Sequence, residues 1–305
     1  MLEHMLYVPL ITPFTASGSV DLDGLSSLAV GLLADGATGL VALGTTGEPS
    51  SLTVAEREAV LSVVAEVCAS RGAPLLVGAN SPAELAALRD RPEVRGALTL
   101  VPPLLRPGPE GVLAYFTQLA EASPVPLVVY HVPLRTGQDL PPSYVERLAA
   151  LPNVVGMKYA PGVLSADSVE VFASLPSAFS VYCGDDALLA PILALGARGS
   201  ITASAHVATA SYASFIASGG VSLGHLLGRL SAALFAEPNP TVIKGVLYAQ
   251  GRIATPSVRL PLLPASSSTV EAALALAPRL GPTPLGPTPL GPTPEGALRM
   301  EGALR

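Results

Sequence analysis

The segment NVVGMKYA, residues 153–160, is an apolar stretch of the length of a β-strand, and it contains a lysine, Lys158. Eight stretches of this kind occur in the first 204 residues, and a helical pattern separates each from the next. They are mostly continuous apolar runs, as expected of strands that are covered by helices. The expected strands are residues 6–14, 39–47, 74–80, 96–103, 126–133, 153–160, 179–186 and 199–204. Eight strands alternating with helices predict an α/β fold, the closed TIM (β/α)8 barrel.

The rest of the chain predicts a C-terminal helical extension and a tail. Residues 205–278 show the pattern of helices throughout, so we expect a barrel over residues 1–204 and a helical domain over residues 205–278. Residues 279–305 repeat L-G-P-T-P, a composition that predicts a disordered tail. An open, doubly wound sheet is the alternative fold, although no G-x-G-x-x-G follows the first expected strand.

Composition limits the possible functions. The 305 residues are 50% hydrophobic and 13% charged, yet no uninterrupted apolar run is long enough to span a bilayer. The chain opens without the pattern of a signal peptide, so we expect a soluble, cytoplasmic protein. The net charge of −6 gives no reason to expect nucleic acid or an anionic membrane as a partner. The two cysteines, Cys68 and Cys183, lie in apolar surroundings and are expected to be buried, inert thiols.

Reactive side chains gather where the expected strands end, which is the active-site face of a TIM barrel. The sequence contains no cluster of His, Cys and carboxylates at metal-ligand spacing, no G-x-S-x-G and no phosphate-binding loop, so we expect neither a metal nor a cofactor. An amine, a phenol, two hydroxyls and a guanidinium remain, a set that suits carbonyl chemistry. The candidate residues are Thr45, Thr46, Tyr130, Arg135, Lys158, Gly184, Asp185, Asp186 and Ile201.

Lys158 is the candidate nucleophile. Only two of the 17 Lys and Arg residues are lysines, and an apolar strand disfavours an ammonium because it is poorly solvated there. A neutral amine attacks the carbonyl of a keto acid to form a Schiff base, and a nearby tyrosine can transfer the protons. The alternative is a lysine that extends its charge to solvent at the barrel rim without a catalytic role. Asp185 and Asp186 are interpreted as loop and helix-capping residues rather than catalytic acids.

Five motifs occur in the order found in a known enzyme family. They are GTTGEPSSLTVAERE (44–58), YHVPLRTGQDLPP (130–142), GMKYAPG (156–162), YCGDDALLAPILALGARGSI (182–201), and FAEPNPTVIKGVLYAQG with RLPLLP (235–264). Together they resemble the dihydrodipicolinate synthase/N-acetylneuraminate lyase family of class I, pyruvate-dependent aldolases. The resemblance implies a TIM barrel with C-terminal helices, a homotetramer or homodimer, and pyruvate bound covalently to a lysine.

The resemblance also assigns roles to individual residues. It implies that Lys158 forms the Schiff base and that Tyr130 is the catalytic tyrosine of the family's Y-N-V-P motif. By the same resemblance Thr45 belongs to the proton relay, Thr46 binds the pyruvate carboxylate, and Ile201 offers its backbone to bound pyruvate.

The second substrate is suggested by Arg135. It matches the arginine that holds the carboxylate of the aldehyde in the synthase branch, and sugar-acid lyases of the family generally lack an arginine there. Gly184, after the seventh expected strand, is expected to contact substrate. Three residues depart from the family pattern: the relay tyrosine falls on Leu104, His131 replaces the usual Asn, and Tyr159 replaces the Glu after the lysine. Because side chains alternate along a strand, Tyr159 is expected to face the helices.

We therefore expect a lyase that condenses pyruvate with an aldehyde, L-aspartate 4-semialdehyde, in the biosynthesis of diaminopimelate and lysine. Its expected partners are these small molecules and further copies of itself. Two alternatives stay open. One is a pyruvate aldolase that acts on another short 2-keto acid or a sugar acid, for which Leu104 would be the signature. The other is a family member that binds pyruvate without catalysis, although the presence of Lys158, Tyr130 and Arg135 together argues against it.

Overall fold

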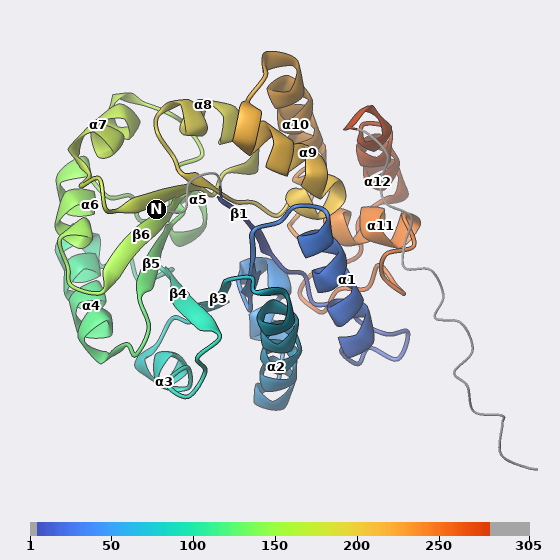
Figure 1. Ribbon diagram of the computed structural model, residues 1–305, viewed down its shortest axis with the longest axis horizontal. Helices are drawn as coiled ribbons and strands as arrows, with labels where there is room; N and C mark the ends of the chain where they lie inside the picture. Colours follow the sequence, from blue (N-terminus) through green and yellow to red (C-terminus); the bar gives the residue numbers. More distant parts are fainter. Residues whose placement is uncertain (1–4, 281–305) are drawn as a thin grey trace, which may run out of the picture.

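Eight parallel strands close into a barrel in the computed structural model of the protein, which describes residues 5–280 apart from the side chains of residues 278 and 279 (Figure 1). Each strand pairs with the next along the chain, and β8 pairs with β1. The expected TIM barrel is confirmed, with strands shorter than the apolar runs that predicted them. The strands are β1 (Met5–Pro9), β2 (Gly39–Ala42), β3 (Leu75–Gly78), β4 (Val94–Leu100), β5 (Leu127–His131), β6 (Val154–Tyr159), β7 (Ser180–Cys183) and β8 (Gly199–Ile201).

Helices surround the barrel (Figure 1). Those that follow β1 to β7 are α1 (Leu22–Ala34), α2 (Val54–Arg71), α3 (Pro82–Ala86), α4 (Gly108–Ala122), α5 (Pro133–Thr136), α6 (Pro142–Ala149), α7 (Ala166–Ser174) and α8 (Leu189–Ala194). Four short 3-10 turns complete the elements: η1 (Thr45–Gly47), η2 (Pro49–Ser51), η3 (Asp186–Leu188) and η4 (Ala277–Leu280). At the start of α2, Thr53 and Glu56 form the expected capping box.

The core has two layers that correspond to the two faces of the strands. The larger layer lies between the strands and the helices, and the smaller one fills the barrel interior. Alternation along a strand assigns neighbours to different layers, so Tyr130 belongs to the interior while Tyr159 belongs to the outer layer. Tyr159 donates a hydrogen bond to Ser168 at the start of α7, at 3.0 Å, which places it against the helices as expected.

Four further helices follow β8: α9 (Ala205–Ser218), α10 (Val221–Leu234), α11 (Thr241–Ala249) and α12 (Ser267–Leu274). The expectation that this region is helical throughout is wrong between α11 and α12. Pro256, Pro261 and Pro264 fall in that stretch, and proline lacks the N–H that a helix interior requires. The tail expected at the C-terminus lies outside the described residues from residue 281 onward.

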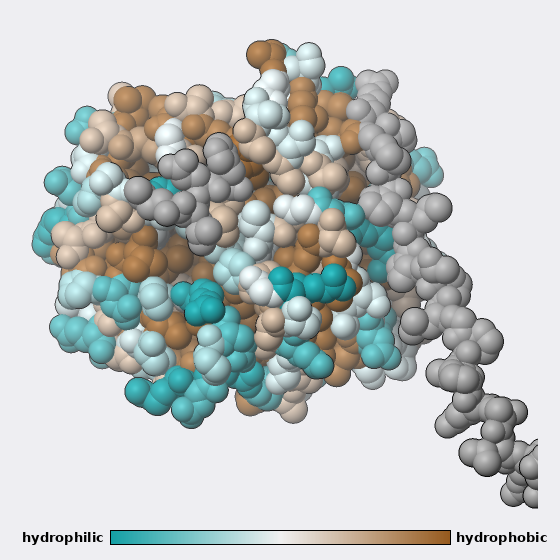
Figure 2. Space-filling model, in the orientation of Figure 1, coloured by the Kyte–Doolittle hydropathy of each residue, from teal (hydrophilic) through white to brown (hydrophobic). Residues whose placement is uncertain are grey.

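The surface of the described part is mixed in polarity. Figure 2 shows hydrophilic side chains gathered along the lower edge of this face, over α3, and more hydrophobic residues around α7 and α8. Within residues 5–280, no helix is both long enough and apolar enough to cross a membrane. Cys68 and Cys183 are free and buried, and burial raises the pKa of the Cys68 thiol to about 12.

Candidate active site

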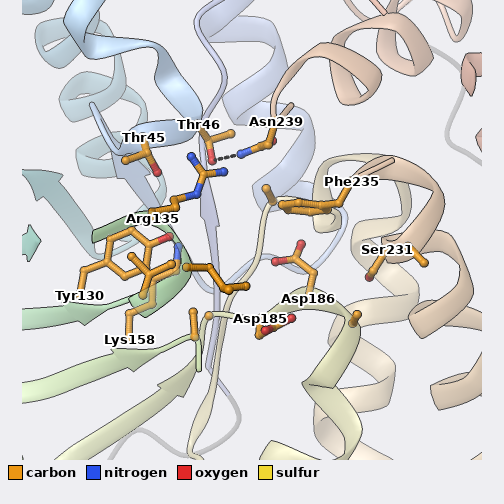
Figure 3. Close-up of a pocket in the computed structure, with 17 residues that line it drawn as sticks. Thr45, Thr46, Tyr130, Arg135, Lys158, Asp185, Asp186, Ser231, Phe235 and Asn239 are labelled. Atoms are coloured by element: carbon orange, nitrogen blue, oxygen red, sulfur yellow. Dashed lines mark hydrogen bonds between the residues drawn. The ribbon is translucent and has the colours of Figure 1, made fainter. Parts of the chain in front are cut away.

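A cavity of about 290 Å³ opens at the carboxyl ends of the strands (Figure 3). Six of the seven residues expected to act on substrate line it: Thr45, Thr46, Tyr130, Arg135, Lys158 and Gly184. The loops after β2, β5, β6 and β7 contribute these residues, because the carboxyl ends of parallel strands meet at one face of the barrel. Residues that are far apart in the sequence are therefore gathered around one small space.

Lys158 lies at the bottom of this cavity, next to Tyr130. In the sheet register it pairs with Tyr130 on β5 and with Tyr182 on β7. Its side chain is buried, and its Nζ lies 4.1 Å from the centroid of the Tyr130 ring. An amine that contacts a phenol in a water-poor interior is suited to attack a carbonyl while the phenol transfers protons.

Gly184 leaves room for the Lys158 side chain. A Cβ atom at residue 184 would lie 2.5 Å from Cγ and 2.8 Å from Cε of Lys158. The backbone N–H of Gly184 donates to the carbonyl of Tyr159 at 2.8 Å, which holds this strand end against β6. The absence of a side chain at residue 184 is therefore a condition for the observed position of the lysine.

Thr45 and Thr46 lie in η1, directly after β2. Thr45 is exposed in the cavity, whereas Thr46 is buried and accepts a hydrogen bond at 2.9 Å from Nδ2 of Asn239. Glu48 ends this turn with a φ of 53°, in the left-handed region that non-glycine residues rarely adopt. Its carboxylate forms a buried ion pair with Lys244, with 2.5 Å between Oε1 and Nζ.

The lysine of this ion pair has a perturbed pKa. Burial lowers the pKa of Lys244 to about 8, against the attraction of Glu48. The ammonium also lies 4.1 Å from the centroid of the Phe14 ring. Lys244 is thus committed to a contact with Glu48, behind the two threonines, and does not line the cavity.

Arg135 lies on α5, the single helical turn that follows β5. Gly137 ends this turn with a φ of 69° and so allows the chain to reverse. The Arg135 side chain is exposed at the cavity, and in Figure 3 its guanidinium points toward the side on which Thr45 and Thr46 lie. A guanidinium in this position can receive a carboxylate from a ligand by paired hydrogen bonds.

Two carboxyl groups line the opposite side of the cavity (Figure 3). Asp186 accepts a hydrogen bond from the backbone N–H of Ser204 at 2.6 Å, and burial raises its pKa to about 6. Asp185 accepts from the backbone N–H of Gly162 at 3.1 Å, and burial raises its pKa as well. Both side chains hold neighbouring loops, which differs from the expected cap of the helix that follows them.

Three residues named from the sequence do not line the cavity. Ile201 is fully buried in the barrel interior beside Tyr130. Leu104, at the position of the family's relay tyrosine, lies in the loop after β4 with 89% of its surface exposed. His131 faces the outer layer, where its ring stacks on Tyr159 and its Nε2 lies 3.1 Å from Oδ1 of Asp139. This contact lowers the pKa of Asp139.

The helical extension contributes residues that the sequence did not assign to the site. Ser231 and Phe235, at the end of α10, and Asn239, before α11, line the cavity on the side away from Lys158 and Tyr130 (Figure 3). A signal was present for Asn239, because it stands between two prolines in the motif EPNP. In the described part of the chain, no group of three or more His, Cys, Asp or Glu side chains is placed to hold a metal ion.

Comparison with known proteins places the chain among enzymes of one kind. A profile of the dihydrodipicolinate synthetase family matches residues 3–277. The chain is 38% identical over 286 residues to a 4-hydroxy-tetrahydrodipicolinate synthase of Synechococcus elongatus, with 89% of this chain and 94% of the relative covered. It is 35% identical to the enzyme of that name from Neisseria meningitidis, with 92% of this chain and all of the relative covered.

Solved structures agree with the sequence comparison. The dihydrodipicolinate synthase of Thermotoga maritima superposes with a TM-score of 0.85 at 29% identity, covering 92% of this chain and 99% of that structure. A chloride-inhibited dihydrodipicolinate synthase from Acinetobacter baumannii, complexed with pyruvate, superposes with a TM-score of 0.84 at 30% identity and the same coverage.

Proposed function

The chain belongs to the dihydrodipicolinate synthetase family, and we propose that it condenses pyruvate with L-aspartate 4-semialdehyde through a Schiff base at Lys158. One observation carries this proposal: the buried Nζ of Lys158 lies 4.1 Å from the Tyr130 ring at the bottom of a cavity. The names of the relatives and the pyruvate complex of the Acinetobacter protein support the same substrate.

The proposed reaction begins at the lysine. Nζ of Lys158 attacks the ketone carbon of pyruvate, a C–N bond forms, and the ketone oxygen leaves as water, which gives an imine. Loss of a methyl proton converts the imine to an enamine, whose carbon then bonds to the aldehyde carbon of the second substrate. Hydrolysis of the imine consumes a water molecule and restores the lysine. Tyr130 and Thr45 serve as the groups that transfer protons in these steps.

The carboxylates of the two substrates bind at different places. Thr46 holds the carboxylate of pyruvate next to Lys158, where the backbone of Ile201 and the space at Gly184 complete its surroundings. Arg135, exposed at the cavity, holds the carboxylate of the aldehyde. A cavity of about 290 Å³ is at the small end of the range for ligand pockets, which suits two short substrates better than a long sugar acid.

The alternative substrate is another aldehyde or short keto acid, and Leu104 is the observation that favours it. A leucine cannot transfer a proton, and this one is exposed on a loop outside the cavity. Assaying the purified protein with pyruvate against a series of aldehydes distinguishes the two functions. Turnover of L-aspartate 4-semialdehyde well above that of other aldehydes supports the synthase function, and preference for another aldehyde supports the alternative.

Assembly into a homodimer or homotetramer stays a prediction, as does the cytoplasmic location. Three leucines on loops at the active-site end support assembly, since Leu104, Leu105 and Leu134 are 89%, 82% and 82% exposed. Exposed apolar side chains that gather on one face are typical of contacts between protein subunits. Sedimentation of the protein over a range of concentrations tests this.

Trapping the imine tests the proposed function directly. The protein is treated with pyruvate and borohydride, digested, and mapped by mass spectrometry. We expect one adduct on Lys158, and Lys158→Arg should abolish it because an arginine stays protonated. Lys244, the second lysine of the chain, serves as an internal control. An adduct on Lys244, or none at all, would contradict the mechanism.

A further inference from the structure

The loop that carries the two active-site threonines is held by the C-terminal extension. Asn239 and Lys244 lie five residues apart, just before and within α11. Nδ2 of Asn239 donates to Oγ1 of Thr46 at 2.9 Å, and Nζ of Lys244 lies 2.5 Å from Oε1 of Glu48. A single short segment of the extension thus contacts both ends of the Thr46–Glu48 turn.

The contact at Glu48 keeps this turn in an unusual conformation. Glu48 has a φ of 53°, and a non-glycine residue in the left-handed region costs about 1–2 kcal/mol. Such a conformation persists only where the surroundings hold it. Both carboxylate oxygens of Glu48 are engaged, one by Lys244 and the other by the backbone N–H of Arg259 at 2.9 Å. The position of Thr46 relative to Asn239 is therefore set by buried, charge-assisted contacts.

The contact at Thr46 has a direction. A hydroxyl group offers one proton and two acceptor positions. Because Asn239 donates to Oγ1, one acceptor position is occupied and the proton remains available. Within residues 5–280 the Thr46 hydroxyl donates to no other group, and Thr46 lines the cavity. The hydroxyl proton is thus left for a ligand.

We propose that Asn239 is a positioning residue for pyruvate: by donating to Thr46, it leaves the Thr46 proton free to bind the substrate carboxylate. The proposal rests on the proposed function, since it takes pyruvate to bind beside Lys158. Oδ1 of Asn239 is buried and has no hydrogen-bonding partner in the described part of the chain. The test must therefore distinguish donation to Thr46 by Nδ2 from acceptance by Oδ1.

Two substitutions make this distinction. Asn239→Asp keeps the shape but can only accept, so it takes the Thr46 proton away from the cavity. Asn239→Leu removes the hydrogen bond and leaves the hydroxyl free to rotate. A net hydrogen bond amounts to about 2–10-fold in affinity, and one to a charged group amounts to about 10–100-fold. We therefore expect the half-saturating pyruvate concentration for borohydride trapping to rise about 2–10-fold in Asn239→Leu and about 10–100-fold in Asn239→Asp.

Thr46→Val is the matched background, because it removes the hydroxyl and keeps the shape. If Asn239 acts through Thr46, Asn239→Leu should change the half-saturating pyruvate concentration less than about 2-fold in this background. The same background separates direct repulsion between an aspartate and pyruvate from the effect that passes through the hydroxyl. A merely structural role for Asn239 would lower the fraction of protein that can be trapped without changing the half-saturating concentration.

The outcomes separate this inference from the proposed function. Equal effects of Asn239→Leu with and without the Thr46 hydroxyl would overturn the inference, as would wild-type pyruvate affinity in Asn239→Asp. In either case adduct formation on Lys158 in the wild type would leave the proposed function standing. Failure of the wild type to form that adduct would overturn both.

Discussion

Replacing Gly184 by alanine should displace Lys158 while the barrel stays folded. A Cβ atom at this position would lie 2.5 Å from Cγ and 2.8 Å from Cε of Lys158. Ordinary contacts between carbon atoms are about 3.5–4.0 Å long, so the lysine side chain must shift by about 1 Å. A displacement of that size at reacting groups can cost about 100-fold in rate. We therefore expect Gly184→Ala to slow the formation of the pyruvate adduct about 100-fold.

The assay follows the adduct on Lys158 by mass spectrometry after timed exposure to pyruvate and borohydride. Urea unfolding is measured in parallel, because overpacking costs about 1–3 kcal/mol of the free energy of unfolding. Gly31→Ala is the matched control: it lies in α1, and a Cβ atom there would have no other atom within 4 Å. It should leave trapping unchanged and stabilise the fold by about 0.5–1 kcal/mol. Trapping at the wild-type rate in Gly184→Ala would refute the steric argument.

Three further predictions concern the aldehyde, the proton relay and stability. Arg135→Ala should raise the Michaelis constant for the aldehyde about 10–100-fold and leave that for pyruvate nearly unchanged, whereas Arg95→Ala, an exposed arginine on β4, should change neither; equal effects on both substrates would contradict the role of Arg135. Leu104→Tyr should raise turnover of L-aspartate 4-semialdehyde up to about 100-fold by restoring a phenol, and unchanged turnover would show that the relay does not need this residue. The third prediction is that the stability of the wild type falls as the pH drops from 6.5 toward 4: burial lowers the pKa of His206 to about 4, so the unfolded chain binds the proton first. His206→Gln should remove about 3 kcal/mol of that pH dependence in urea unfolding, and an unchanged pH dependence would exclude His206 as its source.

The sequence determined the parts of this protein that depend on near neighbours in the chain. The capping box joins Thr53 to Glu56, three residues away, so its geometry follows once the helix forms. Strand alternation placed Tyr159 on the helix side, and the order of apolar runs was enough to predict the barrel. The prediction of continuous helix failed where Pro256 and Pro261 interrupt it, a local signal outweighed by the apolar pattern around it.

Tertiary structure decided the contacts that complete the site. Asn239 and Thr46 are 193 residues apart, and Glu48 and Lys244 are 196 apart, yet their atoms meet at 2.9 and 2.5 Å. The role of Gly184 likewise depends on where β6 holds Lys158. Burial of apolar side chains has no direction, so a one-dimensional pattern is enough to encode it. Hydrogen bonds and steric limits depend on distances of a few tenths of an ångström, and these exist only once the barrel has closed and the extension has packed against it.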